Sequence, residues 1–146
     1  MKIKIQEHTP NRIGTMVMNI LDILKSVGVP FDKETDLRKQ RMAQACMAIG
    51  GIKKSFKEVK SVKDGTFLRT RDIIKFENEH YGENISSSSY DDIRRKDLKL
   101  LVLSNIAINT VAIGKVIAKH LIKRLLLFIM LEYGIEFEKV LIAKKV

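Results

Sequence analysis

Apolar residues recur at three- and four-residue intervals in the first third of the chain, and this spacing predicts two amphipathic α-helices. The first is predicted over residues 11–27, with Asn11 as its N-cap, and the second over residues 34–49. Glycines follow both stretches and indicate where the helices end. The apolar faces comprise Ile13, Met16, Val17, Ile20, Leu21 and Leu24 in the first helix, and Leu37, Met42, Ala45, Cys46 and Ile49 in the second.

The same periodicity returns in the middle of the chain and predicts two further helices joined by a short polar turn. One is predicted over residues 71–81, with Thr70 as its N-cap and Gly82 at its end. The other begins at about Tyr90, where Ser89 and Asp92 have the spacing of a capping box. Its apolar arc holds Tyr90, Ile93, Leu98, Leu101 and Val102. Arg94 falls inside this arc, so we expect the first turn to project beyond the core while the C-terminal half is packed. This pair has the form of a helix-turn-helix.

Four segments follow from these patterns. Residues 1–51 form an N-terminal helical segment, 52–67 a basic, irregular connector and 68–108 the helix-turn-helix, while 109–146 hold an apolar C-terminal helix and tail. Residues 106–108 favour a short strand, and the pattern over 111–131 favours a helix. The fold class predicted is mainly α, a helical bundle that contains a helix-turn-helix or winged-helix-like unit. The sequence does not decide whether this unit has a wing.

The chain is basic overall, with a formal net charge of +10 over 146 residues. Residues 1–64 contribute 13 − 7 = +6, residues 65–108 contribute 7 − 7 = 0, and residues 109–146 contribute 7 − 3 = +4. This balance favours polyanions, nucleic acid first among them, although charge alone fits a solvated basic surface equally well. Within the neutral middle segment the charges are sorted, and the serine run 86–89 precedes a cluster of cations at Arg94, Arg95, Lys96 and Lys99.

Other chemistries find little support in the sequence. The single cysteine, Cys46, excludes an intramolecular disulfide and has no histidine at metal-ligand spacing, so we expect no metal site. Asp91 and Asp92 are a conceivable metal pair, but acids in a first helical turn more often interact with the helix dipole. Gly50-Gly51 lacks the Lys-Ser/Thr of a phosphate-binding loop. The N-terminus shows no secretory signal, and the longest C-terminal apolar run, residues 125–131, is too short to span a bilayer.

The segment from Thr70 to Ile108 (TRDIIKFENEHYGENISSSSYDDIRRKDLKLLVLSNIAI) resembles the N-terminal helical region of type II restriction endonucleases of the BsuBI/PstI family. The run Ser86 to Lys99 carries most of this resemblance, which extends over residues 12–108 and includes Arg41-Met42-Ala43 and the lead-in Leu68-Arg69-Thr70-Arg71. After Ile108 the chain departs from the polar family pattern, which puts the wing in doubt.

The resemblance implies a winged-helix-like DNA-reading region that precedes a magnesium-dependent nuclease domain of the PD-(D/E)xK type, acting on a short palindrome such as CTGCAG. We find no PD…(D/E)xK arrangement in this chain and expect it to lack the cutting part and to be inactive alone. No cofactor is expected here, because magnesium would belong to the nuclease domain.

The function predicted is double-stranded DNA binding within a restriction-modification system, in the cytoplasm. Contacts to backbone phosphate are expected from Thr70 and Arg71 and from Ser87, Ser88 and Ser89. Base edges or adjacent phosphates are expected for Arg94, Arg95 and Lys96, and a phosphate or solvent for Lys99.

Two alternatives remain at this point. One is a free-standing helix-turn-helix transcriptional regulator that dimerises through its C-terminal helix. The other is a protein-interaction module that has no role at DNA. A homodimer through the C-terminal helix is conceivable in either DNA-binding case, and a membrane partner is not expected.

Overall fold

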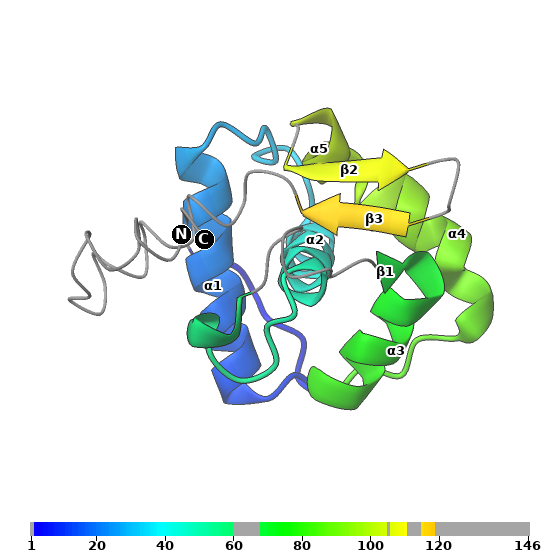
Figure 1. Cartoon of the computed structure of the whole chain (residues 1–146). Helices are drawn as coiled ribbons and strands as arrows, with labels where there is room; N and C mark the ends of the chain where they lie inside the picture. The colour runs from blue at the N-terminus through cyan, green and yellow to red at the C-terminus, as the bar shows by residue number, and fades with distance from the viewer. Residues whose placement is uncertain (1, 60–67, 105, 111–114, 119–146) are drawn as a thin grey trace.

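Helix α2 lies at the centre of the fold, with α1 on one side and α3 and α4 on the other (Figure 1). The computed structural model describes residues 2–59, 68–104, 106–110 and 115–118. The elements follow the chain as α1 (Asn11–Ser26), α2 (Asp36–Ile49), η1 (Phe56–Glu58), β1 (Leu68–Arg69), α3 (Thr70–His80), η3 (Ser87–Ser89), α4 (Tyr90–Asp92), η4 (Ile93–Asp97), α5 (Lys99–Leu103), β2 (Ala107–Thr110) and β3 (Lys115–Ala118).

Both predicted N-terminal helices are present, but only α1 is amphipathic as predicted, because every residue of α2 from Met42 onward is buried. Every apolar residue assigned to the face of α1 is buried, and the helix is followed by Gly28 at a positive φ of 91°. Helix α2 begins where Thr35 accepts a hydrogen bond from the Arg38 backbone N–H. The assignment of Leu37 to the buried face is wrong, since it lies in the first turn of α2, before the buried stretch, and is 42% exposed.

Beyond its first turn α2 is buried on nearly all sides, because α1, α3, η4, α5 and β3 all pack against it. The buried residues of α2 therefore include two with polar side chains, Gln40 and Gln44. Gln40 donates to Thr9 Oγ1 at 2.8 Å and to Gln44 Oε1 at 3.0 Å, and Gln44 donates to Glu83 Oε1 at 3.1 Å. These bonds satisfy both amides and hold the N-terminal segment and the turn after α3 against α2.

The fourth predicted helix is interrupted. The α4–α5 segment, residues 90–103, contains a π-helical turn, η4, in which the Leu98 backbone N–H donates to the Ile93 carbonyl at 2.9 Å. Positions five apart lie about 140° apart around a regular α-helix, yet the π turn places both Ile93 and Leu98 in the core. The first turn projects beyond the core as predicted, since Arg94 is exposed. Tyr90, a member of the predicted apolar arc, is exposed with it.

A three-stranded antiparallel sheet accompanies the helix-turn-helix. Strand β3 lies between β1 and β2, with Leu68 opposite Val116 and Ile108 opposite Ile117 (Figure 1). The short strand expected at 106–108 is confirmed by β2. The helix expected over 111–131 is wrong at 115–118, where the β-branched pair Val116-Ile117 lies in β3. The rest of that stretch, and the tail to residue 146, lie outside the described residues.

The first part of the connector is irregular apart from η1, and two of its apolar side chains lie in the core. Ile52 is fully buried and Phe56, in η1, is 3% exposed. Ser55 accepts from the Lys57 backbone N–H, and Glu58 accepts from the backbone of Lys53 at 3.0 Å. Of the predicted connector over 52–67, the described residues 52–59 are irregular apart from η1, and Ile52 and Phe56 are the two among them that are buried; residues 60–67 lie outside the described part.

Tyr81 ties this segment to the end of α3, since its fully buried hydroxyl donates to the Ile52 carbonyl. We expect Tyr81→Phe to lower the free energy of unfolding by about 1–3 kcal/mol, because it leaves a buried carbonyl without its donor. Urea denaturation followed by circular dichroism measures this change. Tyr90→Phe removes a hydroxyl from an exposed ring and serves as the control. Equal stability of the two variants would show that the Ile52 carbonyl reaches water.

Candidate nucleic-acid interface

Helix α3 begins beside the end of β1 and brings Thr70 and Arg71 to its first turn. The N-cap is Arg69, not Thr70 as predicted, and its backbone N–H donates to Asp72 Oδ2 at 2.9 Å. Helix α3 follows β1 directly and begins one residue earlier than the sequence indicated. Thr70 is thus a helical residue, half-buried, while Arg71 is exposed.

The serine run forms a 3₁₀ turn before α4. Ser86 caps this turn, since its hydroxyl lies 3.4 Å from the Ser88 backbone N–H and 2.8 Å from the Ser88 hydroxyl. The capping box predicted for Ser89 and Asp92 is wrong, because Ser89 already belongs to the 3₁₀ turn and makes no side-chain cap. Ser87 and Ser88 are exposed, and Ser89 is half-buried.

The structure adds Tyr90 to the candidate surface. The guanidinium carbon of Arg71 lies 4.9 Å from the centroid of the Tyr90 ring, and the ring is 42% exposed. This cation–π contact joins the first turn of α3 to the start of α4. The sequence offered no signal for it, because Tyr90 lay on the apolar arc of a regular helix. The contact brings the predicted residue Arg71 next to the serine run.

The three cations after α4 are paired with two aspartates one turn earlier. Arg94 Nη2 lies 2.7 Å from Asp91 Oδ1, while Arg95 lies 3.0 Å from Asp91 Oδ2 and 3.2 Å from Asp92 Oδ1. Lys96 Nζ lies 3.8 Å from Asp92 Oδ1. These side chains are between 43% and 61% exposed, so the pairs are readily exchanged for other partners.

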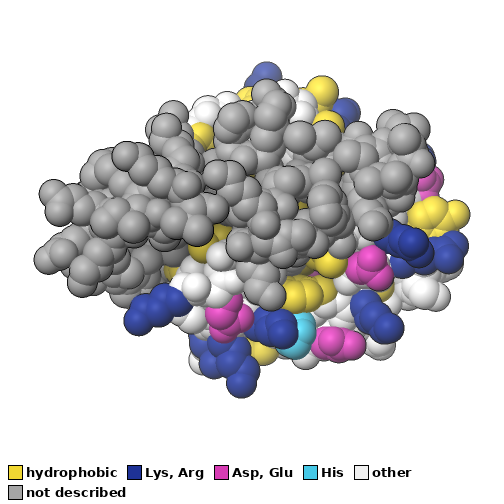
Figure 2. Space-filling view, viewed as in Figure 1, with side chains coloured by type: hydrophobic (Ala, Val, Ile, Leu, Met, Phe, Trp, Pro, Cys, Tyr) yellow, Lys and Arg dark blue, Asp and Glu magenta, His cyan; other side chains and the backbone are white. Residues whose placement is uncertain are grey.

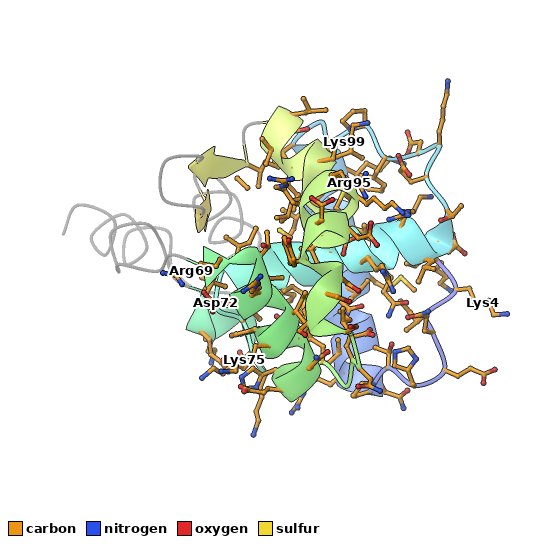
Figure 3. The ribbon with its side chains drawn as sticks, turned by 90° about the vertical axis from the view of Figure 1, so that its right-hand side faces the viewer. Lys4, Arg69, Asp72, Lys75, Arg95 and Lys99 are labelled. Carbon is orange, nitrogen blue, oxygen red and sulfur yellow. The ribbon has the colours of Figure 1, made fainter. Side chains whose placement is uncertain are left out.

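Basic side chains line both helices of the pair. Arg95 and Lys99 follow one another along the α4–α5 segment, Lys75 lies on α3, and Arg69 directly precedes α3 (Figure 3). All four are exposed. Figure 2 shows Lys and Arg side chains gathered at the right-hand edge of the molecule, with acidic side chains among them. The predicted contact residues therefore lie on one helix-turn-helix, in its two helices and the turn that joins them.

Behind this surface a buried charge cluster fixes the α4–α5 segment to the scaffold. Asp97, the last residue of η4, lies 3.7 Å from Arg38 of α2 and is buried, as is Glu77 of α3. Burial raises the pKa of Asp97 to about 6, against the opposing effect of Arg41 and Arg38. Burial, and then the charges of Asp97 and Glu83, raise the pKa of Glu77 well above its usual range.

The remaining titratable groups do not form a reactive centre in the described part of the chain. Burial raises the pKa of the Cys46 thiol, which keeps it protonated in the core. Among the described residues, no group of three or more His, Cys, Asp and Glu side chains is placed to hold a metal ion. No helix within the same ranges is long and apolar enough to cross a bilayer.

Two helices joined by a polar turn, with exposed cations and hydroxyls at their first turns, define a helix-turn-helix domain of the DNA-binding class. A family model described as BsuBI/PstI restriction endonuclease HTH domain matches residues 15–115. The match covers more than half of the chain, and the chain belongs to this family. The match extends seven residues past Ile108 and ends at residue 115. Comparisons with curated proteins and with solved structures found no match.

The buried cluster predicts an unusual pH dependence of stability. The pKa of Asp97 is higher in the folded chain, about 6, than its ordinary value of 3.8, so folding favours the protonated form. Its contribution to stability is greatest below the ordinary value and is lost as the pH rises through about 6. We expect this contribution to be about 1–2 kcal/mol more favourable near pH 5 than near pH 8.

Urea denaturation at the two pH values checks this expectation by comparing the wild-type chain with Asp97→Asn. The wild type should gain more unfolding free energy on acidification than the variant does. Because Glu77 titrates in the same direction, Asp97→Asn/Glu77→Gln should reduce the gain further. A gain in Asp97→Asn as large as that of the wild type would show that Asp97 is not the group responsible.

Proposed function

We propose that this chain binds double-stranded DNA as the DNA-reading part of a type II restriction endonuclease, within a restriction-modification system of the cytoplasm. The observation that carries the proposal is the exposed row of Arg94, Arg95, Lys96 and Lys99 on the second helix of the helix-turn-helix. An α-helix fits the major groove of B-DNA, and arginine pairs with guanine O6 and N7. The family match supports the nuclease context.

In this proposal the first turns of the two helices contact phosphates. Arg71 lies against Tyr90, which limits the orientations of its guanidinium and so lowers the entropy lost on binding a phosphate. Thr70 and the hydroxyls of Ser87, Ser88 and Ser89 supply further donors beside it. Arg94, Arg95 and Lys96 contact base edges or neighbouring phosphates, and Lys99 follows the backbone further along.

The β2–β3 hairpin supports a winged-helix form of this domain. Strand β1 precedes the helix-turn-helix in the sequence, and β2 and β3 follow it. The three strands join in one sheet of order β1-β3-β2, in which β1 pairs with β3. We propose that the hairpin acts as the wing and lies along the DNA backbone beside the α4–α5 segment. A palindromic site would be bound by two copies of the chain, one for each half-site.

The first test is binding of the full chain to labelled duplexes, measured by fluorescence anisotropy at two NaCl concentrations. One duplex contains CTGCAG and the other the same bases in scrambled order. We expect binding that weakens steeply with salt, because phosphate contacts release counterions, and a preference for one duplex. Indifference to DNA at the lower salt concentration would contradict the proposal and favour a protein partner.

Arg95→Ala tests base recognition. If Arg95 contacts a base, its loss should weaken binding to the preferred duplex by about 1–3 kcal/mol and reduce the preference. Arg12→Ala, which removes an exposed arginine from α1, is the matched control and should leave the preference unchanged. Equal losses of Arg95→Ala on both duplexes would reassign this side chain to a phosphate.

A further inference from the structure

The start of the α4–α5 segment is nearly neutral, although three cations stand there in a row. Over residues 90–96 the two aspartates offset two of the three basic side chains, leaving +3 − 2 = +1. Each cation lies within ion-pair distance of an aspartate, and Arg95 lies against both. A DNA-binding helix gains affinity for any sequence from net positive charge, so this pairing works against unselective binding.

The aspartates also place negative charge at the start of the α4–α5 segment. Asp91 and Asp92 lie in the first turn of α4, where backbone N–H groups and the helix dipole favour an anion. Two carboxylates already hold that position. A phosphate brought close to this turn therefore meets like charge on every sequence. Only contacts of the arginines with base edges of a cognate site offset this repulsion.

We propose that Asp91 and Asp92 are specificity determinants that weaken the binding of non-cognate DNA. In the free protein they neutralise Arg94, Arg95 and Lys96. On a cognate site, hydrogen bonds to base edges replace the carboxylate partners of these cations; on other sequences, no such bonds compensate for the exchange or for the repulsion between carboxylate and phosphate. The inference rests on the proposed DNA binding and adds a source of discrimination to it.

Exposure makes this exchange inexpensive. The paired side chains are about half exposed, unlike the Arg38–Asp97 pair, in which the Asp97 side chain is only 2% exposed. Exposed pairs contribute little to stability, so they are broken at small cost when a partner of the right geometry is present. The same segment thus has an exchangeable set of pairs at its first turns and a fixed pair at Asp97.

The test compares the full-length wild type with Asp91→Asn/Asp92→Asn, a change that keeps the shape of both side chains and removes both charges. We expect the variant to bind a scrambled duplex about fivefold to tenfold more tightly at low salt. The slope of log K against log salt should steepen by about 0.9 for each additional phosphate contact. Circular dichroism establishes that the variant is folded.

Glu7→Gln/Asp32→Asn is the matched control, because it changes the net charge equally at two exposed residues that lie on neither helix of the pair. A gain in the control as large as that in the variant would overturn the inference, since net charge alone would then explain it. Unchanged or weaker binding of the variant to scrambled DNA would overturn it as well.

A selection from duplexes with a randomised core measures discrimination directly. We expect the wild type to enrich a defined motif and Asp91→Asn/Asp92→Asn to enrich it less strongly. Equal enrichment by the two proteins would overturn the inference while leaving the proposed DNA binding intact. Failure of the wild type and of the variant to bind any duplex at low salt would instead overturn the proposed function, and the inference with it.

Discussion

The burial of α2 beyond its first turns is the constraint on which the described structure depends. From Met42 to Gly50 each residue of this stretch is buried, and helices stand on both sides of it (Figure 1). A helix in such a position has no solvent face for its polar groups, so Gln40 and Gln44 must find partners within the protein. They find them in Thr9 and Glu83, and this requirement places the N-terminal segment and the turn of the helix-turn-helix against the same helix.

Two kinds of ion pair serve different ends of the α4–α5 segment. At Asp97 the carboxylate is buried beside Arg38, and such a pair orients the segment more than it stabilises the fold, because desolvation offsets the attraction. At Asp91 and Asp92 the pairs are exposed and exchangeable. A DNA-reading helix needs both properties. The scaffold must hold the helix in one orientation, and the side chains of its first turns must be able to change partners.

The π turn η4 connects these two ends. It lets Ile93 and Leu98 share the core while Asp97 is directed to Arg38, and the basic side chains 94–96 remain exposed between them. In a regular helix Arg94 would lie within the apolar arc, as the wheel of the sequence indicated. The sequence therefore predicted a first turn that projects beyond the core. It did not predict the π turn, which lets both Ile93 and Leu98 be buried.

The sequence by itself determined the elements whose residues need only local information: the apolar face of α1, the helix pair around Gly82, and the grouping of hydroxyls and cations at its second helix. It also indicated the family, because that grouping is local too. Only the tertiary structure decided that Ile52 and Phe56 belong to the core, that Tyr90 lies under Arg71, and that 115–118 pair between two strands. Each of these depends on partners distant in the sequence: Tyr81 for Ile52, Arg71 for Tyr90, and β1 with β2 for β3. Periodicity describes one element at a time, whereas burial and strand pairing are properties of the elements that meet.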